Sequence, residues 1–240
     1  MICVEMYNFA PDLQGEEIMM DNGLTLSRFD TFIFDLDGTL LNTLQDLALS
    51  TNWALQQNGY PCHPIDSIRM FVGNGVRRLM ERALPPEVDD KTFQKVFDDF
   101  KQHYLVHSLD NTLPYDGIIP LLRTLTERQK HIAVASNKLQ AGVTLLNRRF
   151  FSEYIPLAIG ESAEMPKKPA PGMLLHAADY FQTPLEKCLY IGDSDVDIAT
   201  ARNCGMTCLS VLWGFRDRDF LLQHGAAHLV ATPYEMISKL

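Results

Sequence analysis

The sequence is short of cysteine and of long apolar runs. It has 5 cysteines in 240 residues, scattered at positions 3, 62, 188, 204 and 208. An odd, scattered set does not suggest the disulfide framework of a small secreted domain, so we expect reduced thiols in a cytoplasmic protein. No apolar stretch approaches the roughly 20 residues that a membrane-spanning helix requires. A disulfide-stabilised fold and a membrane protein are therefore both disfavoured.

Positive charge is also scarce. Lysine and arginine together number 21 against 30 acidic residues, which gives a formal net charge of -9. This balance disfavours a nucleic-acid partner or an anionic membrane surface. No basic residue precedes Arg28, and acidic residues interrupt the apolar stretches before it, so this segment does not resemble a secretion signal. We expect residues 1–28 to form a poorly ordered leader.

One short apolar run ends in an unusual way. The hydrophobic content of 46% is enough for a packed core, and residues 31–34 (TFIF) are typical of a buried strand in a parallel sheet. Asp35 and Asp37 follow directly, where open α/β sheets bind their ligands. Two close carboxylates repel each other and require a cation or a shared proton. The pair predicts a metal-assisted site in which one carboxylate can act as a nucleophile.

The segment 43–113 has helical spacing and no strand signal. Its apolar residues recur at helical intervals in three stretches, at 44–55, 76–83 and 93–104. We therefore predict an all-helical cap domain over 43–113, inserted into a core domain made of 29–42 and 114–240.

After residue 117, helical and strand patterns alternate. The predicted strands lie at 131–135, 157–159, 188–191, 207–212 and 227–230. Such alternation is typical of a doubly wound sheet. The predicted fold class is α/β, with a Rossmann-like, mostly parallel sheet core and an inserted helical cap.

Polar residues stand at further strand ends and before one helix. Ser136 and Asn137 end one predicted strand, and Asp193 and Asp197 follow another. Lys168 lies between these two groups, directly before a proline that precedes a predicted helix. Together with the aspartate pair after the first strand, they form a candidate site.

These motifs resemble those of the haloacid dehalogenase superfamily of aspartate-nucleophile phosphatases. Four motifs occur in the family's order: Asp-x-Asp-Gly-Thr from Asp35, a serine at 136, a lysine before proline at 168, and Gly-Asp-Ser-x-x-Asp from Gly192. The resemblance covers nearly everything from about Phe29 onward. The segments 71–76 and 213–215 are similar to the phosphoglycolate phosphatase branch, whose members carry a helical cap.

Chemistry suggests roles for the first two aspartates. Asp35 is the candidate nucleophile, because a carboxylate that attacks phosphorus gives an acyl phosphate and splits one displacement into two. Asp37 is the candidate general acid, which protonates the departing alkoxide and then activates the hydrolytic water. The alternative for Asp37 is a turn-forming aspartate before glycine.

The second aspartate pair predicts a magnesium site. Asp193 is a candidate ligand for Mg²⁺, which prefers oxygen donors, and Asp197 would hold a metal-bound water or orient Lys168. Capping of the following helix is the alternative for both aspartates. The resemblance implies that Asp35 and the backbone carbonyl of Asp37 also bind the ion.

Three residues are expected to bind the phosphoryl group. We expect Ser136 and the backbone amide of Asn137 to donate hydrogen bonds to its oxygens, and Lys168 to place a positive charge beside Asp35. Lys167 competes with Lys168 on sequence alone. We choose Lys168 because it directly precedes proline, as in the family pattern.

The cap offers weaker signals. Gly75, within a Gly-Asn-Gly segment, and Arg77 are predicted to bind substrate, with Arg77 or Arg78 reaching a substrate carboxylate. A tight turn before a helix and a solvated helix face are the alternatives.

The combined prediction is a Mg²⁺-dependent phosphatase that hydrolyses a small soluble phosphomonoester, with phosphoglycolate first, through an aspartyl-phosphate intermediate. The alternatives are a nucleotidase, a sugar-phosphate phosphatase, a pyrophosphatase or a phosphomutase of the same superfamily. Thr39 and Leu47 stand where β-phosphoglucomutases commonly have valine and histidine, which counts against a mutase. The rival of another class is a non-catalytic phospholigand-binding protein. We expect a small phosphorylated metabolite as partner, no nucleic acid or membrane, and a monomer or homodimer.

Overall fold

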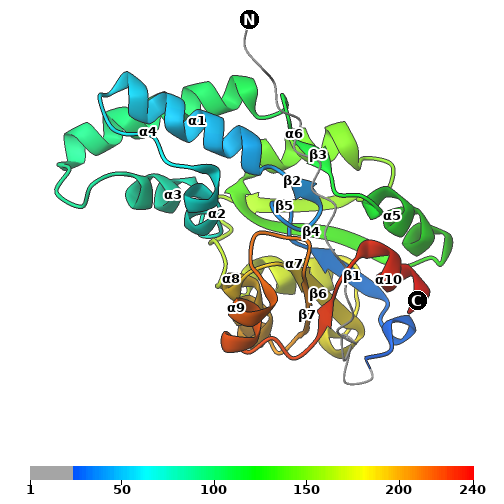
Figure 1. The fold of residues 1–240 in the computed structure, drawn as a ribbon. Coiled ribbons are helices and arrows are strands. Elements are labelled where there is room, and N and C mark those ends of the chain that lie inside the picture. The colour runs from blue at the N-terminus through cyan, green and yellow to red at the C-terminus, as the bar shows by residue number, and fades with distance from the viewer. Residues whose placement is uncertain (1–23) are drawn as a thin grey trace, which may run out of the picture.

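The computed structural model describes residues 24–240, so residues 1–23 of the predicted leader lie outside the described part. An α/β core carries a helical cap (Figure 1). The last residues of the predicted leader pack against the core. Leu26 lies in the short helix η1 (Leu26–Arg28) with 1% of its surface exposed, and Leu24 is also buried. These two apolar side chains give the segment surface to bury, so packing begins before Phe29.

Six strands form one parallel sheet in the order β5-β4-β1-β6-β7-β8. Their bounds are β1 Thr31–Phe34, β4 His131–Leu139, β5 Leu157–Glu161, β6 Cys188–Gly192, β7 Thr207–Val211 and β8 Leu229–Val230. The strand β1 is central: Phe34 pairs with Val134 on one side and with Ile191 on the other. The predicted α/β class with a parallel sheet is confirmed.

Helices cover both faces of this sheet. They are α5 Ile118–Glu127, α6 Gln140–Phe150, α7 Gly172–Tyr180, α8 Asp195–Cys204 and α10 Pro233–Ser238. Successive residues of β1 face opposite sides, so Phe32 and Phe34 pack with residues of α5, α6 and α10. Ile33 packs on the other side with residues of α7 and α8. Burial on both faces explains why β1 is apolar without alternation.

The cap consists of four helices. They are α1 Leu44–Gln57, α2 Ile65–Phe71, α3 Val76–Ala83 and α4 Asp90–His107. Their apolar faces form a cluster of their own, with Leu55, Met80 and Phe100 fully buried. Phe215 of the core also joins this cluster, so the cap packs directly against the loop after β7.

Two short strands join the cap to the core. The strand β2 (Leu41–Asn42) pairs antiparallel with β3 (Leu113–Pro114). Just inside the cap, the buried carboxylate of Asp46 accepts hydrogen bonds from the backbone and side chains of Asn111 and Thr112. The two connections are therefore held side by side.

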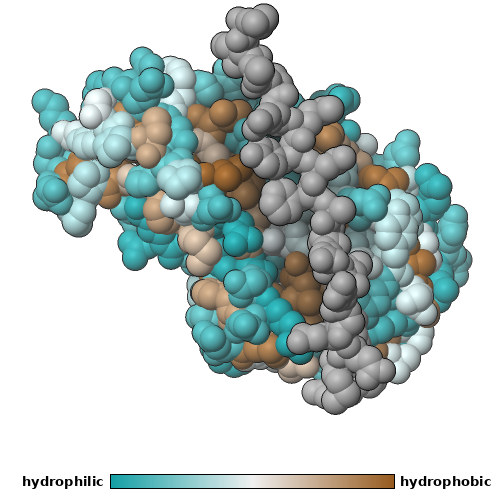
Figure 2. Space-filling view, in the orientation of Figure 1, coloured by the Kyte–Doolittle hydropathy of each residue, from teal (hydrophilic) through white to brown (hydrophobic). Residues whose placement is uncertain are grey.

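One face of the molecule carries mainly polar residues (Figure 2). Figure 2 shows hydrophilic residues over much of one face, with separate hydrophobic patches on the cap and on the core. The remaining elements are the short helices η2 (Leu185–Lys187) and α9 (Arg218–Gln223). Among the helices of residues 24–240, none has the length and apolar character needed to cross a membrane.

Candidate active site

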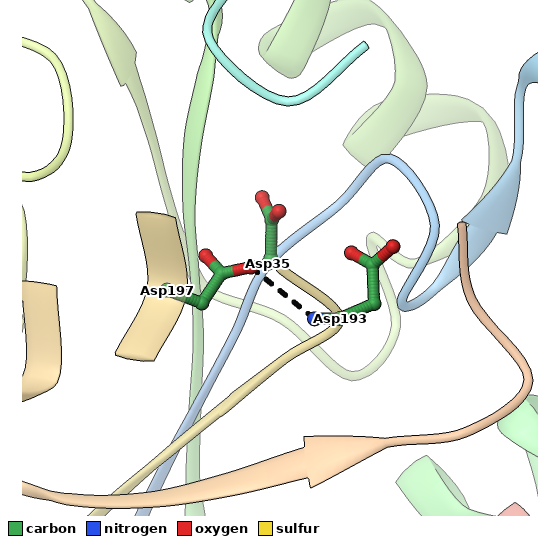
Figure 3. Close-up of side chains that lie close together, drawn as sticks. All are labelled: Asp35, Asp193 and Asp197. Carbon is green, nitrogen blue, oxygen red and sulfur yellow. Dashed lines mark hydrogen bonds between the residues drawn. The ribbon is translucent and has the colours of Figure 1, made fainter. Parts of the chain in front are cut away.

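Three buried carboxylates meet at the carboxyl ends of β1 and β6. Asp35 follows β1, Asp193 follows β6, and Asp197 lies in the first turn of α8. One carboxylate oxygen of each lies within 4.8 Å of the others. The strands are direct neighbours, and the backbone N–H of Asp35 donates to the Ile191 carbonyl at 2.8 Å. Figure 3 shows the carboxylates of Asp35 and Asp193 pointing to the same side, with Asp197 turned toward the backbone nitrogen of Asp193.

Lys168 places its ammonium group in this cluster. Its Nζ lies 2.8 Å from a carboxylate oxygen of Asp35 and 2.8 Å from one of Asp197, and it donates to the Tyr190 hydroxyl at 2.9 Å. Burial alone would lower the pKa of Lys168, but the two carboxylates raise it above its ordinary value. Lys168 is therefore charged, whereas its competitor Lys167 is exposed.

The carboxylate of Asp197 is fully engaged within the protein. Its Oδ1 accepts from Lys168 and Tyr190, and its Oδ2 accepts from the backbone of Asp193 and from Ser194. Burial would raise the pKa of Asp197, but Lys168 and the donated hydrogen bonds hold it below the usual range. Asp197 also forms a capping box with Ser194 at the start of α8. Asp197 therefore caps this helix and also contacts Lys168.

The negative charges of Asp35 and Asp193 are offset by fewer hydrogen-bond donors than that of Asp197. Asp35 accepts from the Leu36 N–H at 2.7 Å, and Asp193 accepts from the Phe215 N–H at 2.7 Å. Burial first, and the neighbouring carboxylate of Asp197 second, raise the pKa of Asp193 to about 7. Burial likewise raises the pKa of Asp35 well above its ordinary value, although Lys168 opposes the effect.

This donor set fits a divalent cation. Lys168 pairs with Asp35 and Asp197 but not with Asp193, so this buried group of three carboxylates holds excess negative charge. The loop after β1 also approaches closely: a Cβ at Gly38, whose φ is +86°, would lie 2.4 Å from Oδ2 of Asp193. Hard oxygen donors of this kind suit Mg²⁺.

The end of β4 contributes Ser136 and Asn137. The Ser136 hydroxyl is 2% exposed and accepts from the Lys138 N–H at 3.2 Å. The side chain of Asn137 accepts from the backbone N–H of Lys168 at 2.6 Å and donates to the Lys168 carbonyl at 3.1 Å. Asn137 therefore holds the loop that carries Lys168, a contact that the sequence did not reveal.

The carboxylate of Asp37 faces a second buried lysine. The Nζ of Lys138 lies 3.0 and 3.1 Å from its two oxygens, and it also donates to the hydroxyl of Tyr104 in α4 at 2.9 Å. Sequence reasoning missed Lys138 as a site residue. The available signal was a charged residue at the end of an otherwise buried strand.

A cavity of about 40 Å³ lies where the cap meets these residues. The core lines it with Asp35, Asp37, Ser136, Asn137, Lys138 and Asp193, and the cap with Leu47, Val72, Gly73, Gly75, Val76 and Leu79. Gly75 therefore lies where substrate binding was predicted. Arg77 is not among the lining residues: its guanidinium pairs with Glu81 at 3.3 Å and lies 4.7 Å above the Phe93 ring. The inward face of α3 is taken by Val76 and Leu79 instead.

Arg216 is a further lining residue that sequence reasoning missed. It lies in the loop after β7 and is 6% exposed. Its guanidinium donates to the backbone carbonyls of Arg69 at 2.8 Å and Val72 at 2.7 Å, at the end of α2. Arg216 thus ties the core to the cap at the rim of the cavity.

Several known proteins are similar to this chain in sequence and in fold. Phosphoglycolate phosphatase from Thiobacillus denitrificans is 34% identical over 188 residues, which is 76% of this chain and 83% of that protein. The enzyme of the same name from Aquifex aeolicus is 33% identical over 184 residues, with 76% and 84% covered. A crystal structure from Lactobacillus delbrueckii subsp. bulgaricus, provisionally named phosphoglycolate phosphatase, superposes with a TM-score of 0.85 at 33% identity, with 88% and 97% covered. The family profile of haloacid dehalogenase-like hydrolases matches residues 32–211, and this chain belongs to that family.

Proposed function

We propose that this protein is a Mg²⁺-dependent phosphatase that hydrolyses a small phosphomonoester, first of all 2-phosphoglycolate, through an aspartyl phosphate on Asp35. The observation that carries the proposal is the Asp35 carboxylate, in contact with Lys168 and facing a cap-covered cavity. Two relatives at 33 and 34% identity are named phosphoglycolate phosphatase, which supports 2-phosphoglycolate as the substrate.

The residues divide the reaction into two displacements. Asp35 attacks phosphorus while Ser136 and the backbone amide of Asn137 donate hydrogen bonds to the phosphoryl oxygens and Lys168 supplies positive charge beside Asp35. The alcohol leaves with a proton from Asp37. Asp37 then takes a proton from the water that attacks the aspartyl phosphate, and inorganic phosphate and free Asp35 result.

Mg²⁺ would be held by Asp35, Asp193 and the backbone carbonyl of Asp37. When bound, it supplies positive charge that offsets the repulsion between a carboxylate and a phosphoryl group. Asp197 supports this arrangement indirectly, because its own oxygens are occupied by Lys168, Tyr190 and the backbone.

The size of the cavity favours a small leaving group. A volume of about 40 Å³ holds roughly three or four waters, since one water needs roughly 10–15 Å³ on the same measure. Even 2-phosphoglycolate therefore requires some outward movement of the cap, and a nucleoside or a hexose requires more. We further propose that 43–113 act as the cap domain on a core made of 29–42 and 114–240.

The cysteines support the proposed cellular location. The four cysteines among the described residues, Cys62, Cys188, Cys204 and Cys208, are free. Free thiols are typical of a reducing compartment, which supports a cytoplasmic location.

The test is phosphate release by the purified protein with Mg²⁺. The panel contains 2-phosphoglycolate, glycerol 3-phosphate, glucose 6-phosphate, a nucleoside monophosphate and pyrophosphate. We expect the highest kcat/KM with 2-phosphoglycolate, and a loss of roughly 10³-fold or more in Asp35→Asn. Asp30→Asn, at an exposed core aspartate, is the matched control and should keep full activity.

Other outcomes refute the proposal. Full activity in Asp35→Asn would exclude the aspartyl phosphate. An isomer in place of free phosphate would indicate a mutase, and tight binding without turnover would favour the non-catalytic rival.

A further inference from the structure

Lys138 is a buried cation that the proposed mechanism does not use. It follows Ser136 and Asn137 at the end of β4 and is 7% exposed. Burying an ammonium group is costly unless it is paired and hydrogen-bonded. Lys138 meets both conditions with partners from different parts of the molecule, Asp37 in the core and Tyr104 in the cap.

The contact with Asp37 fixes a carboxylate with a proposed chemical task. The Lys138 Nζ lies nearly equidistant from the two oxygens of Asp37, at 3.0 and 3.1 Å. A carboxylate held at both oxygens loses its freedom to rotate about its terminal bond. Burial alone would lower the pKa of Lys138, but Asp37 raises it above its ordinary value, so the lysine remains charged.

The contact with Tyr104 reaches into the cap. Tyr104 lies in α4, belongs to the apolar cluster of the cap and stacks on Phe100, with ring centroids 5.5 Å apart and planes 11° apart. Its hydroxyl accepts from Lys138 at 2.9 Å. Burial raises the pKa of Tyr104, so it stays a neutral hydroxyl. Tyr104 is therefore a rigid point of the cap against which the lysine is placed.

The fold also makes room for the stem of Lys138. A Cβ at position 142 would lie 3.2 Å from Cγ and 3.3 Å from Cδ of Lys138, and the residue there is Gly142 in α6. A side chain at that position would press on the lysine and displace it. The local sequence thus favours one course of this side chain, directed toward the cavity that Lys138 lines.

We propose that Lys138 is a positioning residue that orients Asp37 for proton transfer to the leaving alcohol. Lys138 contacts both oxygens of the ionised carboxylate and keeps one of these contacts when Asp37 enters the reaction with the proton on its other oxygen. Its own place is fixed by the contact with Tyr104 of the packed cap. Closure of the cap and acid catalysis are then coupled through one side chain. This inference rests on the proposed phosphatase function, because it concerns the proton that Asp37 gives to the departing alkoxide.

The test compares leaving groups that do and do not need this proton. Ethyl phosphate and 2-phosphoglycolate release an alkoxide, whereas acetyl phosphate, of similar size, releases acetate, which is stable as an anion. We expect Lys138→Met to lower kcat/KM for the two alkyl phosphates by roughly 10–100-fold, within the range of general acid catalysis, and for acetyl phosphate by less than about 3-fold. Tyr104→Phe should show the same selectivity with a smaller loss.

Asp37→Asn and Lys130→Met calibrate the measurement. Asp37→Asn should show the same selectivity in full, because it removes the acid. Lys130 pairs with Asp30 on the core surface, so Lys130→Met removes a more exposed ion pair away from the cavity and should leave all three values unchanged. The ratio kcat/KM is the right measure because it includes steps only as far as the departure of the leaving group.

Any other pattern of kcat/KM losses across the three substrates overturns the proposal. A loss with 2-phosphoglycolate alone would make Lys138 a carboxylate anchor, and an equal loss with all three substrates would make it a structural ion pair. No loss would leave Asp37 independent of it.

A wild-type protein that turns over none of the three refutes the proposed function instead. The contact is then judged by hydrogen exchange at the linker amides of Thr112 and Tyr115, which are bonded to Asp46 and to the Leu40 carbonyl. Faster exchange in Lys138→Met and Tyr104→Phe, but not in Lys130→Met, supports the link between cap and core, and unchanged exchange overturns it.

Discussion

Two buried lysines of the site differ in the residues that they contact. Lys168 contacts Asp35 and Asp197 within the core, whereas Lys138 contacts Asp37 and a tyrosine of the cap. Each ion pair offsets a desolvation cost. Loss of Lys168 would remove the cation beside buried Asp35, and loss of Lys138 would remove the cation beside half-buried Asp37. Both lysines therefore belong to the charge balance of the site.

The cysteines provide a residue-scale prediction on pH. Cys188 lies fully buried in β6, and burial raises the pKa of its thiol to about 11, whereas Cys62 is exposed. A raised pKa means less thiolate at a given pH, and about one thiol in 10³ is ionised three units below the pKa. At pH 8 we expect iodoacetamide to modify Cys62 at least about 100-fold faster than Cys188.

Peptide mass spectrometry over a time course measures both rates in one sample. In 6 M urea the two cysteines should react at similar rates, because unfolding removes the burial that separates them. Equal rates in the native protein would contradict the placement of Cys188.

The residues at strand ends could be predicted from sequence, and those at the cap could not. Asp35 and Asp193 each follow an apolar run, and parallel strands bring their carboxyl ends to one edge of the sheet. The link from Lys138 to Tyr104 depends on how α4 packs on the core, which no local pattern encodes. The orientation of the Arg77 side chain could not be predicted for the same reason, because its guanidinium lies over the ring of Phe93 in another helix.

At the scale of elements, the number of apolar residues at regular spacing decided what the sequence revealed. The helices α1, α3 and α4 each bury several apolar residues at helical spacing and were predicted. The helices α2 and α9 were missed because each buries a single apolar residue, Ile68 and Leu221 respectively. The strands β2 and β3 have two residues each, too few for any alternation to show.

The link between β2 and β3 continues at Asp46, which supports an element-scale prediction. Asp46 lies in the first turn of α1 with 1% of its surface exposed, and it accepts from four donor groups of Asn111 and Thr112. Asp46→Ala leaves those donors without a partner. We expect the free energy of unfolding to fall by about 2–4 kcal/mol.

Urea unfolding followed by circular dichroism measures this loss. Asp98→Ala, at a surface aspartate of the same cap, is the control and should change the unfolding midpoint little. An Asp46→Ala protein as stable as the wild type would show that the two connections do not depend on this carboxylate.

At the scale of the whole molecule, the charge distribution opposes the proposed substrate. The formal net charge of -9 repels an anionic phosphate ester at long range. Attraction must therefore come from a few local cations. Lys138 and Arg216 line the cavity between cap and core, and Lys168 lies beside Asp35 in the core. A bound divalent ion would add to them and would dominate the local field.

Metal binding should also stabilise the fold as a whole. Asp35, Asp193 and Asp197 concentrate negative charge in the core, and a cation that binds only the folded state relieves it. Mg²⁺ at ten times its dissociation constant should add about 1.4 kcal/mol, and the melting temperature should rise by about 3–6 °C for a chain of this size. Differential scanning calorimetry in EDTA and then in excess Mg²⁺ measures the difference.

Asp193→Asn isolates the site responsible for this effect. It removes one carboxylate while it keeps the size of the side chain, so we expect the response to Mg²⁺ to disappear. Asp179→Asn changes an exposed aspartate of α7 and should retain the wild-type response, which separates specific binding from a general effect of salt on an acidic protein. If Asp193→Asn gained as much stability from Mg²⁺ as the wild type, the ion would bind elsewhere, and the assignment of Asp193 as a metal ligand would be wrong.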